Sequence, residues 1–143
     1  MSRTDPTTGA MGGCACGAIR FQISAPAGLG VCHCRACQYA SGGGAAYVAL
    51  APKGSLQVTA GSAKIHFTAA DSGARIGRAF CADCGTPLYS LVPPTTPFDI
   101  VNAGALDDRS SLQPVLEVYT QSAPPWHAFH PDVPAYPGSP TPI

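Results

Sequence analysis

The sequence predicts a mainly β, single-domain protein, and three observations support this prediction. The chain has 143 residues, a length that suits one domain with its own hydrophobic core. It contains 16 glycines and 15 prolines, which disfavour long helices and favour short strands joined by turns. Several short segments also alternate apolar and polar residues, which is the period of a half-buried strand.

The N-terminal segment, residues 1–11, is predicted to be a mobile tail. Ser, Thr, Asp, Pro and Gly predominate in it, and its apolar residues show no periodicity. The segment also lacks the apolar stretch that a secretory signal peptide needs. We therefore expect a single domain over residues 12–143.

The first predicted strand covers residues 18–24, where Ile19, Phe21 and Ile23 alternate with polar residues. A cysteine-rich turn follows this strand. We expect the turn to continue into one helical turn through Tyr39, because a run of glycines then ends any helix.

Further strands are predicted downstream, in segments that are apolar or alternating and are bounded by Gly, Pro, Asp or Ser. They cover residues 45–52, 56–61, 63–69, 75–81, 86–92, 98–104 and 114–121. The second and third of them are predicted to form a hairpin around Gly61-Ser62. The proline-rich remainder, residues 124–143, is predicted to wrap over the sheets as an irregular arm anchored by Trp126, Phe129 and Tyr136.

The charge pattern argues against a polyanionic partner. The formal net charge is +0, and the arginines and lysines are scattered, so nucleic acid and anionic membrane surfaces are poor candidates. No run approaches the roughly 18 apolar residues of a membrane span. We expect a soluble cytoplasmic protein, in which thiols stay reduced and closely spaced cysteines indicate metal binding or catalysis before disulfides.

The 7 cysteines fall into three groups. A central triplet, Cys32, Cys34 and Cys37, is preceded by the pair Cys14/Cys16 and followed by the pair Cys81/Cys84. Each pair borders a predicted strand, so the two pairs together fit a zinc ribbon, in which two remote ligand pairs hold one Zn²⁺ tetrahedrally. Such a closed site is structural and contributes folding free energy, on the order of 10 kcal/mol in small zinc peptides.

The central triplet is left without a fourth cysteine. Three protein ligands with one open position are typical of a catalytic zinc. Three thiolates outweigh the charge of one zinc ion, so this site would be a weaker Lewis acid than one of three neutral histidines. A soft fourth ligand such as a substrate thiolate suits it best. The triplet therefore indicates thiol chemistry rather than hydrolysis.

Three alternatives are compatible with the cysteine spacing. The cysteines could be plain buried residues or form disulfides, although their tight spacing in a reducing compartment argues against this. The triplet could instead form the closed site with one remote cysteine. A histidine, His33, His127 or His130, could also complete the central site and make it purely structural.

Other side chains are weaker candidates for function. His33 lies between two ligands, so its ring points away from their metal, towards a substrate or a supporting partner, or is simply packed. Arg35 either meets an anionic substrate or is an exposed turn residue. Trp126-His127 either lines a pocket or anchors the arm. Glu117 is the only glutamate and is far in sequence from any cysteine. The chain therefore lacks the His-x-Glu motif that nucleobase deaminases combine with their zinc ligands. No general base is visible in the sequence.

Three motifs in a fixed order carry a resemblance to a known family. They are Gly13-Cys14-Ala15-Cys16-Gly17, then Cys32-His33-Cys34-Arg35-Ala36-Cys37 with Ser41-Gly42, then Phe80-Cys81-Ala82-Asp83-Cys84-Gly85-Thr86-Pro87-Leu88. The likeness continues through residues 103–108, 125–126 and 132–137, and it covers about residues 12–140. On these motifs the chain resembles the glutathione-dependent formaldehyde-activating enzyme family, which also includes centromere protein V.

The resemblance implies a β-tent fold, in which small antiparallel sheets surround a zinc ribbon. It also implies two Zn²⁺ per chain, one structural and one catalytic. The implied ligands are Cys14, Cys16, Cys81 and Cys84 for the structural zinc, and Cys32, Cys34 and Cys37 for the catalytic zinc. The implied activity is that of a carbon–sulfur lyase, which joins glutathione to formaldehyde as S-hydroxymethylglutathione.

We therefore expect a zinc-dependent enzyme that adds a small-molecule thiol, glutathione or a similar one, to formaldehyde or a small aldehyde, or catalyses the reverse. A binding module with two structural zincs is one alternative, and it would need a fourth protein ligand at the triplet. A redox or metal-responsive protein that uses the triplet as an oxidisable switch is another. The sequence gives no indication of the oligomeric state.

Overall fold

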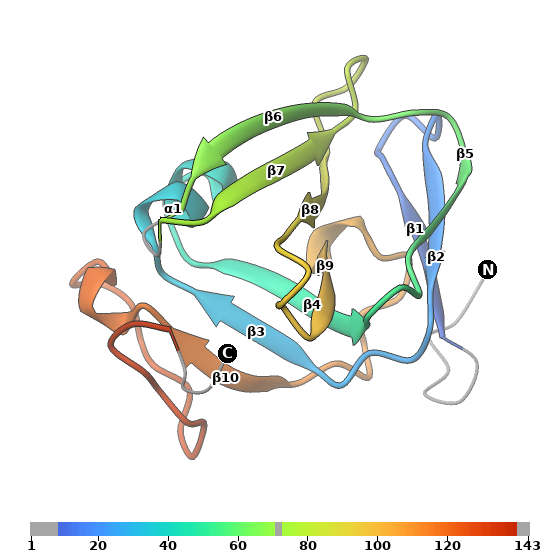
Figure 1. The fold of residues 1–143 in the computed structure, drawn as a ribbon. Coiled ribbons are helices and arrows are strands. Elements are labelled where there is room, and N and C mark those ends of the chain that lie inside the picture. Colours follow the sequence, from blue (N-terminus) through green and yellow to red (C-terminus); the bar gives the residue numbers. More distant parts are fainter. Residues whose placement is uncertain (1–8, 71–72, 140–143) are drawn as a thin grey trace.

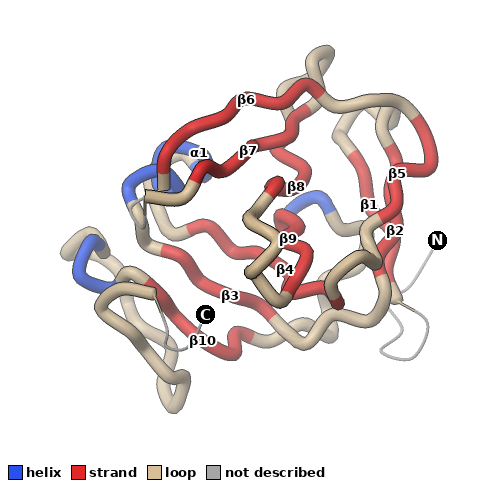
Figure 2. The backbone as a smooth tube through the Cα atoms, viewed as in Figure 1, coloured by secondary structure: helices blue, strands red, loops and turns tan. Residues whose placement is uncertain are grey.

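The computed structural model describes residues 9–70 and 73–139, and within these ranges the chain is mainly β, as predicted (Figures 1 and 2). The strands are β1 (Ala10–Gly13), β2 (Arg20–Ile23), β3 (Leu29–Cys32), β4 (Ala46–Pro52), β5 (Gln57–Ala60), β6 (Lys64–Ala69), β7 (Arg75–Phe80), β8 (Pro87–Leu91), β9 (Phe98–Asn102) and β10 (Pro114–Val118). The helical segments are α1 (Arg35–Ser41) and two single 3₁₀ turns, η1 (Ala103–Ala105) and η2 (Thr120–Ser122).

The strands form two sheets. The smaller sheet has the order β1-β2-β5, and the larger has the order β10-β3-β4-β9-β8-β7-β6. Neighbouring strands are antiparallel except for β10, which runs parallel to β3. The larger sheet curves so that β6 and β7 lie across from β3 and β10, and the smaller sheet stands at one side (Figure 1).

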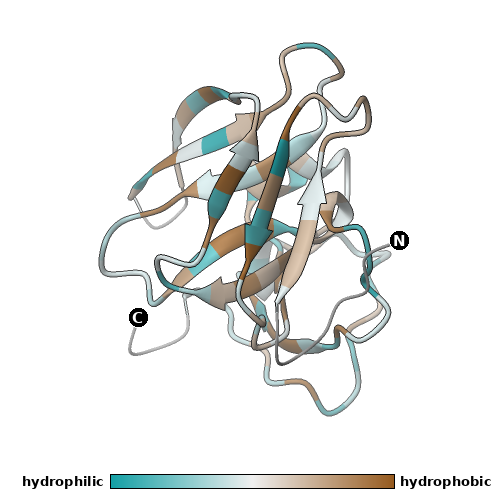
Figure 3. Ribbon diagram, turned by 90° about the vertical axis from the view of Figure 1, so that its right-hand side faces the viewer, coloured by the Kyte–Doolittle hydropathy of each residue, from teal (hydrophilic) through white to brown (hydrophobic). Residues whose placement is uncertain are grey.

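The hydrophobic core lies where the two sheets face each other. Phe21 on β2, Leu88 on β8 and Val101 on β9 belong to one cluster, and each is at most 1% exposed. The predicted alternation of Ile19, Phe21 and Ile23 is confirmed, since all three are buried and the residues between them are not. Figure 3 shows the same alternation of apolar and polar residues along several strands. It arises because successive side chains of a strand point to opposite faces of the sheet.

The strand β3 is absent from the sequence prediction, which places a turn there. This strand has only 4 residues and contains Gly30, so it carries little propensity of its own. Its conformation comes from pairing with β4 on one side and β10 on the other. The predicted helical turn is confirmed as α1, and it ends at Gly42, whose φ of 91° suits a left-handed helix cap.

The predicted hairpin between residues 56–61 and 63–69 is wrong. Both strands form, but β5 pairs with β2 and β6 pairs with β7, so they belong to different sheets. The chain changes sheet at Gly61, where φ is +72° and a Cβ atom would lie 2.3 Å from the carbonyl oxygen of Ala18. A glycine lets the backbone approach that closely, and the chain then turns away from β5.

The two ends of the domain also differ from the prediction. Most of the tail predicted over residues 1–11 lies outside the described residues, but Ala10 and Met11 belong to β1, which pairs with β2. The arm after residue 124 is irregular, as predicted, with one isolated bridge between Ala135 and Glu117. Of the three predicted anchors, Trp126 is wrong, because this residue is 75% exposed. Phe129 is 49% exposed, but its ring contacts those of His33 and His127, and Tyr136 is partly buried.

None of the helices among the described residues is long and apolar enough to cross a membrane. Their short length follows from the frequent glycines and prolines, which interrupt helices.

Candidate metal centres

The first candidate centre, called the four-sulfur site, joins two distant turns. Cys14 and Cys16 follow β1, and Cys81 and Cys84 follow β7, and their Sγ atoms all lie within 4.8 Å of one another. The Sγ atoms of Cys14 and Cys16 are 3.5 Å apart, and those of Cys16 and Cys81 are 3.8 Å apart. Sulfurs at about 2.3 Å from one tetrahedral zinc are expected to lie roughly 3.8 Å apart. The four residues therefore fit a closed metal site.

The two turns of the four-sulfur site have the same backbone form. The Gly17 N–H donates to the carbonyl of Cys14 at 3.0 Å, and the Gly85 N–H donates to the carbonyl of Cys81 at 2.8 Å. The φ angles of these glycines are 81° and 79°, in the left-handed region that favours glycine. Each turn thus folds back on itself and presents two sulfurs to the same point.

Thr86 connects the two turns. Its hydroxyl accepts a hydrogen bond from the Ala15 N–H at 3.0 Å and lies 3.2 Å from Cys84 Sγ. The Thr86 side chain and backbone lower the pKa of Cys84 to about 6, because their hydrogen bonds stabilise the thiolate. The thiolate is the form that binds metal, so this arrangement favours a ligand role for Cys84.

The second candidate centre, called the three-sulfur site, consists of Cys32, Cys34 and Cys37. Cys32 ends β3, and Cys34 caps α1 by accepting a hydrogen bond from the Cys37 N–H at 3.3 Å. The three Sγ atoms lie within 4.8 Å of one another. Within residues 9–70 and 73–139, no fourth cysteine, histidine or carboxylate joins this group. The three-sulfur site therefore offers three candidate ligands among the described residues, and the two cysteine groups are separate.

Arg78 places positive charge beside the three-sulfur site. Its guanidinium Nη2 lies 3.7 Å from Cys37 Sγ, and its Nε is buried without a hydrogen-bond partner among the described residues. The pKa of Cys37 is lowered to about 3, chiefly by hydrogen bonds from the thiols of Cys32 and Cys34, and further by the charge of Arg78. One sulfur of the site is thus held as a thiolate next to a cation.

A hollow of about 480 Å³ extends from Arg78. Its lining includes the basic side chains Lys64, His66 and Arg78. A second hollow of about 330 Å³ adjoins it, since both are lined by Ala40 and Asn102. Of these basic groups Arg78 is the one that contacts a sulfur of the three-sulfur site, and basic groups in a hollow suit a substrate that carries carboxylates.

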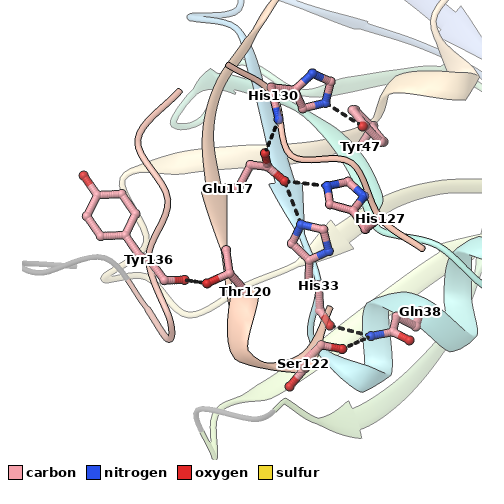
Figure 4. Close-up of polar contacts among 9 residues, drawn as sticks. All are labelled: His33, Gln38, Tyr47, Glu117, Thr120, Ser122, His127, His130 and Tyr136. Atoms are coloured by element: carbon pink, nitrogen blue, oxygen red, sulfur yellow. Dashed lines mark hydrogen bonds and ion pairs between the residues drawn. The ribbon is translucent and has the colours of Figure 1, made fainter. Parts of the chain in front are cut away.

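A third group, called the His–Glu–His cluster, consists of His33, Glu117 and His127 (Figure 4). Glu117 Oε1 lies 2.8 Å from Nε2 of His33 and 2.9 Å from Nε2 of His127. Its other oxygen accepts a hydrogen bond from the backbone N–H of His130 at 2.8 Å. Burial alone would raise the pKa of the Glu117 carboxyl, but these hydrogen bonds outweigh burial, so the pKa lies below its usual value.

The parallel pairing of β10 with β3 creates this cluster. Glu117 pairs with Val31 across the two strands, and His33 follows the end of β3. His127 comes from the arm, which turns back over β10 and pairs the Tyr136 N–H with the carbonyl of Glu117 at 2.9 Å. Three segments that are distant in sequence therefore meet at one buried carboxylate.

The family can be identified at this point. The sequence model of the glutathione-dependent formaldehyde-activating enzyme family matches residues 9–122, which include all the cysteines. The chain belongs to this family. The crystal structure of a Rhodobacter sphaeroides protein has a similar fold, with a TM-score of 0.53 and 22% sequence identity over 68% of this chain and 87% of that chain. No curated protein is significantly similar to this family member.

The structure of this family member separates the alternatives left open by the cysteine spacing. All cysteines are free thiols, so the disulfide alternative is not supported. The pairs form one group and the triplet forms another, which argues against a site that mixes them. His33 and His127 belong to the cluster around Glu117, not to the three-sulfur site. Arg35 turns along its own helix, since it donates to Gln38 at 2.8 Å.

Two important residues of this family member are missing from the sequence prediction. The sequence prediction places Arg78 in a strand without a role, because its proximity to Cys37 depends on the fold. Glu117 is dismissed because it is far in sequence from any cysteine. One signal for Glu117 is present in the sequence, because the only glutamate of the chain is flanked by apolar residues within a predicted strand.

Proposed function

We propose that this protein is a zinc-dependent enzyme that adds a thiol, such as glutathione, to formaldehyde or another small aldehyde, or catalyses the reverse. In this proposal the four-sulfur site holds a structural zinc and the three-sulfur site holds a catalytic zinc. The observation that carries it is a complete group of four sulfurs beside a separate group of three with no fourth protein ligand among the described residues. Family membership supports the thiol and the aldehyde as substrates.

The donor atoms of both sites fit zinc. Thiolates are preferred zinc ligands, and the sulfur separations of the four-sulfur site agree with one tetrahedral ion. Zinc in the three-sulfur site would supply one open coordination position that favours the thiolate form of a bound thiol.

Gln38 fixes the backbone conformation around the three-sulfur site. Its side-chain amide donates to the carbonyl of His33 at 2.8 Å and to the carbonyl of Ser122 at 2.7 Å. The first bond holds the loop between Cys32 and Cys34, and the second ties α1 to the segment after β10. A fixed ligand geometry lowers the reorganisation needed to bring thiol and aldehyde together.

The basic hollow binds the rest of the thiol substrate in this proposal. Lys64 and Arg78 line it, and Arg78 also contacts Cys37. A thiol with carboxylates, as in glutathione, would place a carboxylate against these cations while its sulfur reaches the three-sulfur site. The hollow thus favours acidic thiols over neutral ones.

The proposed reaction is a balanced addition. The C–S bond forms, the π bond of the aldehyde carbonyl breaks, and the thiol proton ends on the former carbonyl oxygen. The reverse reaction breaks the same C–S bond, which makes the enzyme a carbon–sulfur lyase. No oxidant or reductant is consumed.

The test is the exchange rate between free and thiol-bound ¹³C-formaldehyde, measured by NMR with and without the protein. This measurement is suited to the question because the adduct also forms without an enzyme. We expect the protein to accelerate the exchange, Cys34→Ser to abolish the acceleration, and Tyr39→Phe, an exposed change on the same helix, to preserve it. If zinc-loaded protein accelerates exchange with neither glutathione nor a simpler thiol, the proposal is wrong.

A further inference from the structure

The His–Glu–His cluster has the donor set of a metal site. Nε2 of His33, Nε2 of His127 and a carboxylate oxygen of Glu117 lie within 4.8 Å of one another. Both imidazoles direct Nε2 at the same carboxylate oxygen, at 2.8 and 2.9 Å. Two imidazoles with one carboxylate bind zinc in some enzymes and iron(II) in others.

The cluster is buried, and the only ion-pair partners of its carboxylate among the described residues are the two histidines. The side chains of His33 and Glu117 are 0% exposed, and that of His127 is 13% exposed. Within the part of the chain that the structure describes, Glu117 forms no ion pair with an arginine or a lysine. A histidine is a positive partner only when it is protonated, and a divalent cation between the three ligand atoms would balance the buried carboxylate beside neutral imidazoles.

The cluster shares no ligand with either sulfur site, although His33 lies between Cys32 and Cys34 in the sequence. Its ligand atoms form a group of their own, and no sulfur belongs to it. His127 also lies beyond residues 9–122, the range that the family model matches. The site therefore follows from the geometry of this chain and does not depend on the proposed thiol chemistry.

We propose that His33, Glu117 and His127 form a third metal site, for a divalent first-row transition ion such as zinc. The ion fastens the C-terminal arm to the edge of the larger sheet, because its ligands come from the end of β3, from β10 and from the arm. Water completes the coordination on the side of His127, the least buried ligand.

Metal content tests this proposal on the full chain. After equilibrium dialysis against zinc, we expect three ions in the wild type, two in His127→Asn, and three in His66→Asn, which changes an exposed histidine on β6. Cys34→Ser is expected to lose the ion of the three-sulfur site and keep that of the cluster, so failure of the proposed enzyme function and failure of this site give different results. Equal metal content in the wild type and His127→Asn would overturn the proposal.

Cobalt substitution gives a second test on the wild type alone, which is useful if His127→Asn fails to fold. Cobalt bound to thiolates produces intense sulfur-to-metal charge-transfer absorption, whereas cobalt bound to imidazole and carboxylate does not. We expect the third equivalent of Co²⁺ to raise the melting temperature and add ligand-field absorption without further charge transfer. A third equivalent that adds thiolate charge transfer, or that does not bind, would contradict the proposal and leave the cluster as a hydrogen-bonded clasp for the arm.

Discussion

The four-sulfur site joins two turns that are 65 residues apart between Cys16 and Cys81, whereas the three-sulfur site uses one short segment between β3 and α1. In the four-sulfur site, two cysteine pairs on turns of the same backbone form bring four sulfur atoms together. In the three-sulfur site, there are only three sulfur atoms. The guanidinium of Arg78, which also lines the hollow, lies near one of them.

This difference shows how ligand spacing relates to the role of a metal site. A site that links distant segments constrains the whole chain, so loss of one ligand acts on folding. A site on one segment adds little constraint, so loss of one ligand acts on the local chemistry. The following variants test this division, from the largest expected effect to the smallest.

Cys81→Ser is expected to have the largest effect. Cys81 is 2% exposed and supplies one of the four sulfurs. A structural zinc contributes on the order of 10 kcal/mol in small zinc domains, which is comparable with the whole stability of a domain. We expect the variant to be unfolded by circular dichroism and NMR, and Ala82→Ser in the same turn to be folded. A folded variant that keeps its metal would contradict a folding role for the four-sulfur site.

Cys34→Ser is expected to remain folded but inactive. It removes one ligand of the three-sulfur site and leaves the four-sulfur site complete. Loss of a catalytic metal removes several kcal/mol of transition-state stabilisation, so aldehyde exchange should slow by at least about 100-fold. Mass spectrometry of the metal content and circular dichroism measure the two effects together. Unfolding of Cys34→Ser would show that both sites are structural.

Arg78→Met is expected to change the pH dependence of the three-sulfur site alone. Removal of the guanidinium raises the pKa of Cys37, so protons compete with the metal at higher pH. The pH at which this site is half-emptied should therefore move upward, while that of the four-sulfur site stays the same. Loss of a charge-assisted contact should also raise KM for an acidic thiol roughly tenfold.

The control for this variant is Arg75→Met, at the exposed end of the same strand. It removes the same charge without removing a contact to a sulfur. An equal shift in both variants would mean that net charge, and not the position of Arg78, controls the site.

Thr86→Val is expected to have the smallest effect, confined to the four-sulfur site. The hydroxyl accepts from Ala15 and contacts Cys84, so its loss should cost about 1 kcal/mol of unfolding free energy. Chemical denaturation measures this change, with Thr95→Val in an exposed loop as the control. A variant that instead loses activity at full stability would connect Thr86 to the three-sulfur site and contradict the division.

Much of the local structure was predictable because it depends on local signals. The alternation of Ile19, Phe21 and Ile23 predicts a strand, and the glycines after Ser41 predict the end of α1. Strand pairing was less predictable, as the false hairpin between β5 and β6 shows. Both strands carry the period of a strand, but that period does not specify a partner.

The arm illustrates the same limit. Its composition predicts an irregular segment held by aromatic side chains, because large apolar groups usually pack inward. Trp126 is instead exposed, and His127 and the backbone of His130 reach Glu117. Sequence distance concealed this contact, since Glu117 and His33 are 84 residues apart.

By itself, the sequence determined the mainly β class, the strands with clear periodicity and the division of the cysteines into pairs and a triplet. These features depend on the spacing of residues that are close in sequence, which the amino-acid order gives directly. Only the tertiary structure decided that β10 lies parallel to β3, that Arg78 reaches Cys37 and that Glu117 meets two histidines. Such contacts depend on which strands pair and how the sheet curves, and those outcomes are set by packing of the whole core.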